Sequence, residues 1–315
     1  MLLAVALAFA QSQSQSAAAA GGWSSGRPPE CSAEGGASVA NIWERAKSPE
    51  LRRYCDLVAS AASKLAGTAG MAQAALEAAR EAEGVSPGHA APKVLEGRAL
   101  AALGKVDEAA LALREGKARD RAGLDDPLAL LAWGRVLART GDTGGAVEAY
   151  RALLPRTASM SSAERAAAAV EAGLVGMASG PGALDDAIAA LREALREAQD
   201  DALGVAVLAL ALALDRRGDG GAARTLLADR AHGDPRVTLD AARAKELLVV
   251  APTETSALAA LALETGDPAG ARAAWERYLA GLVPTATRPW EAHARAHLAG
   301  LPPRARGGPM PARAR

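Results

Sequence analysis

The stretch GRVLARTGDTGGAVEAY, residues 134–150, contains the pattern that decides the fold. A small residue, Gly134, is followed seven positions later by Gly141, five later by Ala146 and four later by Tyr150. Alanine, leucine and arginine favour helices, whereas glycine tolerates the left-handed backbone conformation in which helices often end. The stretch therefore predicts two helices joined by a short turn at Gly141.

The same spacing recurs along the chain. In each of five blocks a small residue is followed seven positions later by a glycine, and from Gly104 to Gly266 these glycines lie 37 to 48 residues apart. Self-similarity at such a period is the signature of a repeat architecture. The small residues that begin the five blocks are Gly97, Gly134, Gly173, Ala211 and Ala259.

This skeleton resembles the tetratricopeptide repeat (TPR), a helix-turn-helix unit of 34 residues with small, aromatic and proline consensus positions. Trp133, Tyr150 and Trp275 occupy consensus aromatic positions, and other blocks use leucine. The resemblance covers residues 90–281, and weakly 46–89. It implies an all-α fold, an α-α superhelix or TPR-like solenoid of about six helix pairs with a C-terminal capping helix at 288–301. An alanine-rich helical bundle is the alternative, because helical periodicity serves both.

Boundary signals agree with the period. An N-cap side chain precedes a proline at the first helical position three times, and Ser161 with Glu164 has the spacing of a capping box. The longest interval between turn glycines leaves room for an additional or lengthened helix at 237–250. The N-cap and proline pairs are Ser48-Pro49, Asp126-Pro127 and Asp267-Pro268.

The N-terminal residues resemble a secretory signal peptide. An apolar run from Met1 ends in an Ala-x-Ala site before Gln11, although no basic residue precedes the run. Either the true start lies upstream, or the segment is an apolar disordered end. The predicted organisation is a signal peptide or leader at 1–22, a flexible segment at 23–45, the solenoid at 46–301 and a disordered Arg/Pro tail at 302–315.

The two cysteines, Cys31 and Cys55, lie near the N-terminus. In an exported protein an isolated pair is most simply a disulfide, here joining the leader to the first helix pair. The alternative is two unpaired thiols in a cytosolic protein.

Composition restricts the classes of partner. Lys+Arg and Asp+Glu both total 36, so no overall field attracts nucleic acid or an anionic membrane. The apolar stretch Leu203 to Leu214 is too short to cross a bilayer and is followed at once by charges, so we expect no membrane span in the mature chain.

No constellation of residues indicates catalysis. His293 and His297 are four residues apart, so on a helix they share a face, but position 294 is alanine where a zinc protease has glutamate, and no third ligand is evident nearby. We expect two solvated histidines on a capping helix, no metal, no cofactor and no enzymatic activity.

The family resemblance also places a concave groove on the first helices of the repeats. The groove is expected to be apolar, with arginines toward its N-terminal half, and to bind an apolar or acidic protein segment. The alternative is that these side chains contact neighbouring helices. The residues assigned to the groove are Arg98, Leu131, Arg135, Arg139, Leu212 and Arg216.

The function expected from this reasoning is a non-catalytic protein–protein interaction scaffold in the periplasm or cell envelope. The alternative is a cytosolic regulatory or sensor module that binds a peptide or small ligand.

Overall fold

A computed structural model describes residues 28–31, 49–66, 69–229, 239, 241–282 and 289–303. Throughout these residues the regular elements are helices. The chain divides into two compact units, residues 1–159 and 160–315.

The first unit contains six α-helices and four short 3-10 helices within the described residues. The 3-10 helices are η2 (Pro29–Cys31), η3 (Ala69–Met71), η4 (Arg121–Leu124) and η5 (Leu154–Ser159). The α-helices are α3 (Pro49–Ala66), α4 (Ala72–Val85), α5 (Ala90–Ala102), α6 (Val106–Arg119), α7 (Pro127–Arg139) and α8 (Thr143–Leu153).

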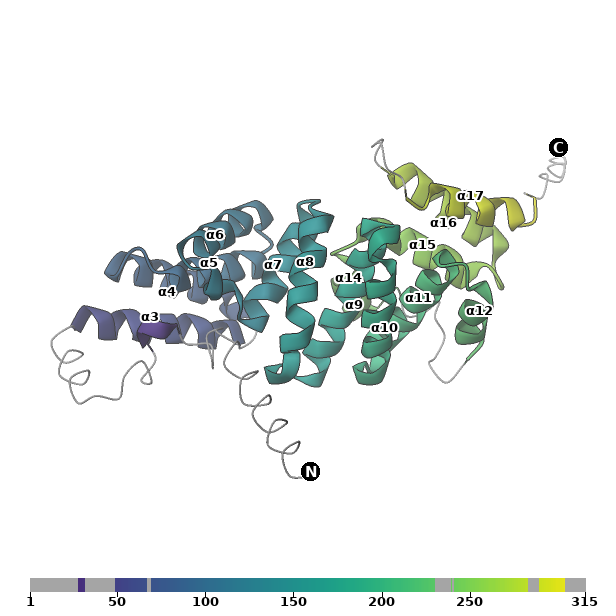
Figure 1. Cartoon of the computed structure of the whole chain (residues 1–315). Coiled ribbons are helices and arrows are strands. Elements are labelled where there is room, and N and C mark those ends of the chain that lie inside the picture. Colours follow the sequence, from purple (N-terminus) through teal and green to yellow (C-terminus); the bar gives the residue numbers. More distant parts are fainter. Residues whose placement is uncertain are drawn as a thin grey trace, which may run out of the picture. The chain divides into compact units, whose positions relative to one another are not determined.

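These six helices form consecutive pairs, in which α3 packs on α4, α5 on α6 and α7 on α8 (Figure 1). Successive pairs are stacked, because α3 contacts α5, α5 contacts α7, and the second helix of each pair packs on the first helix of the next. The first helices therefore follow one another in contact, as in a helical-repeat protein.

Small residues let the paired helices approach closely. A Cβ atom added to Gly97 would lie 2.5 Å from Cγ of Leu113, and one added to Gly134 would lie 2.9 Å from Cε2 of Tyr150. The turn glycine Gly141 has a φ of 84°, a conformation that other residues adopt rarely. The helix-turn-helix unit predicted from residues 134–150 is confirmed.

A short N-terminal segment is attached to the first helix pair. The structure joins Cys31 to Cys55 of α3 in a disulfide. One residue earlier, Glu30 accepts a hydrogen bond of 2.7 Å from the Tyr54 hydroxyl and lies 3.3 Å from Nδ1 of His89. The tyrosine is fully buried, so the segment covers part of the core of this unit.

The second unit contains eight α-helices and one short 3-10 helix, η6 (Pro181–Ala183), within the described residues. The α-helices are α9 (Ser162–Ser179), α10 (Leu184–Glu197), α11 (Asp200–Arg216), α12 (Gly220–Ala228), α14 (Ala242–Leu248), α15 (Pro252–Leu263), α16 (Pro268–Gly281) and α17 (Glu291–Gly300).

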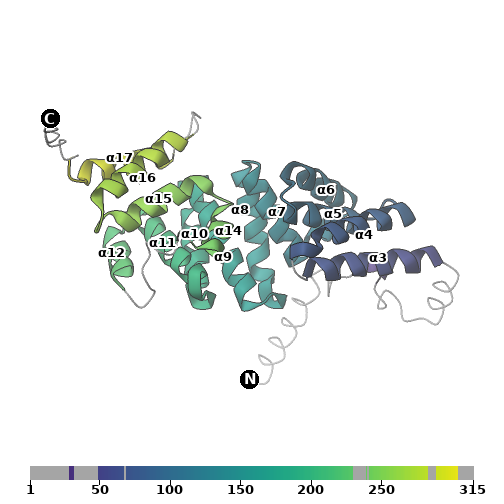
Figure 2. The same cartoon turned by 180° about the vertical axis from the view of Figure 1, so that it is seen from behind.

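Helix α9 lies at the centre of this unit. It pairs with α10 and also contacts α11, α14 and α15, and every residue from Ala166 to Met177 is buried. Helices α11 and α12 form a second pair and α15 and α16 a third, while α17 packs along α16 (Figure 2). Because α14 and α15 pack on α9 and α11, the face that the sequence predicted to be open is covered in this unit.

The predicted boundaries agree with the caps. The Asp126 and Asp267 side chains accept hydrogen bonds from the first turns of α7 and α16. Ser161 and Glu164 form the capping box at the start of α9. The predicted cap at Ser48 lies outside the described residues, as do the predicted signal peptide and most of the Arg/Pro tail. Among the described residues, none of the helices combines the length and apolarity needed to cross a membrane.

Candidate functional site

The predicted groove residues of the first unit lie on α5 and α7. Arg139 is exposed, Arg135 is half-buried and Leu131 is buried at 6% exposure. Arg98 is largely buried and pairs with Asp126, at 3.7 Å between Nη1 and Oδ2. Burial lowers the pKa of Arg98, and the charge of Asp126 opposes that shift. Arg98 is thus largely buried, whereas Arg135 is half-buried and Arg139 is exposed.

The groove prediction is wrong for the second unit. Leu212 is fully buried, because α14 and α15 pack on α11. Arg216 is also buried, and its Nη1 donates a hydrogen bond of 2.6 Å to Oε2 of Glu254 on α15. Its guanidinium lies 4.8 Å from the centre of the Trp290 ring, and Nη2 donates to the Tyr278 hydroxyl. Both residues hold helices together and face no open groove.

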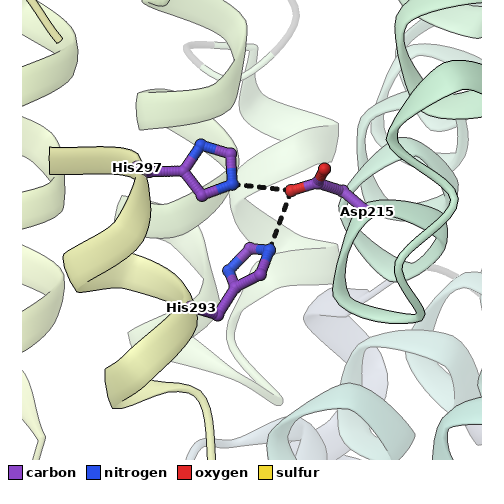
Figure 3. A group of neighbouring side chains, drawn as sticks. All are labelled: Asp215, His293 and His297. Carbon is purple, nitrogen blue, oxygen red and sulfur yellow. Dashed lines mark hydrogen bonds and ion pairs between the residues drawn. The ribbon is translucent and has the colours of Figure 1, made fainter. Parts of the chain in front are cut away.

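A second cluster gathers beside this buried ion pair, at the C-terminal end of α11. His293 and His297 project from one face of α17 toward Asp215, the penultimate residue of α11 (Figure 3). Nε2 of His293 lies 2.8 Å from Oδ2 of Asp215, and Nε2 of His297 lies 2.7 Å from the same oxygen. The three side chains are 17–18% exposed, so the prediction of solvated histidines is wrong.

A second carboxylate fixes the ring of His297. Nδ1 of His297 donates to Oε1 of Glu264 at 2.7 Å, and the indole N–H of Trp275 donates to the same oxygen at 2.8 Å. Hydrogen bonds to Asp215 and Glu264 raise the pKa of His297 to about 9, against the opposing effect of burial. In the metal-free protein at neutral pH, His297 is therefore protonated on both ring nitrogens.

The central carboxylate is held ionised. Burial opposes ionisation of Asp215, but hydrogen bonds from His293 and His297 outweigh burial and keep the pKa of Asp215 well below its usual range. Nδ1 of His293 is buried and has no hydrogen-bond partner among the described residues. The cluster is thus a carboxylate between two imidazoles, with one imidazole backed by a second carboxylate.

The donor set can also hold a metal ion. One nitrogen from each histidine and one oxygen of Asp215 lie within 4.8 Å of one another. Two imidazoles and a carboxylate are a ligand set that Zn²⁺ accepts. Sequence reasoning identified the histidine pair and missed Asp215, which lies 78 residues before His293. The sequence alone does not show that His293 and His297 of α17 meet the C-terminal end of α11.

Among the comparisons with known proteins, only the search of solved structures gives matches. No protein-family model matches the chain, and no curated protein matches it. The solved structure of Naa15/Naa10 bound to HypK-THB is similar over 78% of this chain, with 16% sequence identity and a TM-score of 0.40. This chain spans 39% of the matched chain. The helix pairs themselves define the class: an all-α, TPR-like helical-repeat fold with a C-terminal helix after the last pair.

Proposed function

We propose that the protein is a non-catalytic scaffold of the tetratricopeptide type, which binds an extended protein segment on the α5–α7 face of its first unit. The observation that carries the proposal is a stripe along α7. Leu128, Leu131, Arg135 and Arg139 follow at spacings of three and four residues, which places them on one side of the helix.

The chemistry of this stripe suits an acidic segment with apolar side chains. Exposure increases along α7, from buried Leu131 through half-buried Arg135 to exposed Arg139. An arginine fork binds a carboxylate through two parallel hydrogen bonds, which gives orientation as well as affinity. The partly covered leucine Leu128 adds apolar contact area beside the charges.

Selection from a random peptide library on the purified chain tests the proposal. We expect enrichment of acidic peptides, and we expect the Arg135→Glu/Arg139→Glu variant to bind an enriched peptide at least tenfold more weakly in fluorescence polarisation. The matched control is Arg114→Glu/Arg151→Glu, which changes the net charge of the same unit equally at exposed positions. Equal loss in both variants would mean that only long-range charge acts and that the stripe is not the binding surface.

The proposed compartment is the periplasm or cell envelope. The disulfide between Cys31 and Cys55 supports export, because such bonds persist in oxidising compartments. Intact-mass analysis of the protein from its native cell tests this point. Export predicts removal of the apolar N-terminal residues and a mass two hydrogen atoms below that of the reduced chain. An intact N-terminus with two free thiols would favour the cytosolic regulatory module instead.

A further inference from the structure

We propose that Asp215, His293 and His297 form a binding site for one transition-metal ion of the Zn²⁺ type, which fixes α17 to the end of α11. The three residues supply one carboxylate oxygen and two imidazole nitrogens, all within 4.8 Å (Figure 3). Their spacing follows from the fold, since residues four apart on α17 share a face and that face meets the last turn of α11.

The ligand atoms lie slightly too close together for a bound Zn²⁺, and a small rearrangement would make room for it. Zn²⁺ holds nitrogen and oxygen ligands at about 2.0–2.2 Å, so tetrahedral ligand atoms lie roughly 3.3 Å apart. The Nε2 to Oδ2 distances are 2.7 and 2.8 Å, those of hydrogen bonds. An outward movement of the Asp215 carboxylate by about half an ångström would open the site to an ion of this size. Three protein ligands leave a fourth position for water.

The surroundings of His297 are those of a metal ligand. A ligating histidine almost always donates its other ring N–H to a carboxylate or carbonyl, which fixes the tautomer and the ring. Glu264 is that carboxylate, at 2.7 Å from Nδ1, and it is itself positioned by the N–H of Trp275. With Nδ1–H bonded to Glu264, Nε2 points at Asp215, and a bound ion replaces the proton on Nε2, which is released to solvent.

Charge balance also favours a divalent ion. Asp215 and Glu264 bring two negative charges to the cluster, and the adjacent Arg216 is already neutralised by Glu254 at 2.6 Å. A divalent cation with two neutral imidazoles compensates both carboxylates. Nδ1 of His293 has no hydrogen-bond acceptor among the described residues, so we expect a lower metal affinity than in sites where every ligating histidine is hydrogen-bonded on its other ring nitrogen.

Metal binding would matter for α17 because this helix has little apolar anchorage. Of its ten residues only Ala294 is buried, and short helices depend on tertiary contacts for stability. The preceding Trp290 is anchored by its indole N–H, which donates to the Met177 carbonyl at 2.7 Å. A coordinated ion would replace the hydrogen bonds of His293 and His297 to Asp215 with coordinate bonds, and so strengthen the attachment further along the helix.

Isothermal titration of the untagged, EDTA-treated full-length chain with ZnCl₂ tests the proposal. We expect one Zn²⁺ per chain, slower amide hydrogen exchange at 291–300 once Zn²⁺ is added, and Co²⁺ absorption bands of a four-coordinate site. The His293→Gln/His297→Gln variant should lose this binding by at least a hundredfold. The matched control, His89→Gln/His232→Gln, removes the chain's two other histidines and should bind as the unmodified chain does.

The Glu264→Gln variant keeps all three ligands and should retain one ion per chain with roughly 10–100-fold lower affinity. If the His293→Gln/His297→Gln variant loses helix content in its circular dichroism spectrum, its loss of binding could come from misfolding. The affinity of Glu264→Gln then serves as the test of the metal site. If the unmodified chain does not bind Zn²⁺ stoichiometrically, the proposal is overturned. The cluster is then only a set of hydrogen-bonded ion pairs between the histidines and the carboxylates. Undiminished binding by a folded double glutamine variant, or an unchanged affinity in Glu264→Gln, would overturn it as well.

Discussion

Gly134 packs directly against the ring of Tyr150: a Cβ atom at Gly134 would lie 2.9 Å from Cε2 and 3.1 Å from Cζ of that tyrosine. The tyrosine is 2% exposed, so its ring has little room to move. This contact joins the two helices of one repeat, α7 and α8. The pair Gly97 and Leu113 makes the equivalent contact between α5 and α6.

The first prediction follows from this contact. Gly134→Ala should destabilise the protein by about 1–3 kcal/mol, because the added methyl group overpacks the crossing of α7 and α8. Urea denaturation followed by circular dichroism measures the change. The control is Gly144→Ala, near the start of α8, where the nearest atom to the added Cβ is 4.0 Å away. Helix propensity favours alanine over glycine at both positions, so equal changes in stability would show that the close contact at Gly134 is unimportant.

A second prediction concerns Arg98, which sequence reasoning placed on an open groove. Arg98→Glu should destabilise the first unit, since it would put a carboxylate beside Asp126, and 14% exposure leaves the charge little water. Arg139→Glu, at an exposed position of α7, should change stability by less than about 0.5 kcal/mol. Thermal melting of the two variants measures the difference. Equal melting temperatures would mean that the Arg98 side chain is as well solvated as Arg139.

Local patterns predicted much of this fold. The turn at Gly141, the caps at Asp126 and Asp267 and the capping box at Ser161 depend on residues within a few positions of one another, and the structure has all of them. The additional or lengthened helix expected at 237–250 is the separate helix α14, at Ala242–Leu248. Periodicity therefore predicted which segments are helical and how neighbouring helices pair.

The same patterns could not show what packs on α9 and α11. Their apolar residues are equally suited to an open groove and to a core, and only the return of α14 and α15 onto these helices decides between the two. For the same reason sequence reasoning found His293 and His297 but not Asp215, whose approach depends on where α17 packs. The covered face of α9 and α11 and the cluster at Asp215 both depend on contacts between helices that are far apart in sequence.

The third prediction tests the buried ion pair between α11 and α15. Glu254→Ala should destabilise the protein by about 3–5 kcal/mol, because it leaves the Arg216 guanidinium buried without its carboxylate. Glu148→Ala removes an exposed partner of Arg151 and should alter stability by less than about 1 kcal/mol. Chemical denaturation compares the two. A loss below 1 kcal/mol for Glu254→Ala would show that Tyr278 and Trp290 suffice to hold the arginine.

The last prediction concerns the covalent attachment of the N-terminal segment. Cys31→Ser/Cys55→Ser should destabilise the protein by about 3 kcal/mol, the loop-entropy value for a closed loop of this size, since the cysteines lie 24 positions apart in the sequence. Tyr54→Phe removes only the hydrogen bond to Glu30 and should cost about 1 kcal/mol. Melting with and without a reductant distinguishes the two effects. The reductant should lower the melting temperature of the unmodified chain and of Tyr54→Phe, and leave the double serine variant unchanged. A reductant-dependent shift in the double serine variant would mean that the measured effect does not come from this disulfide.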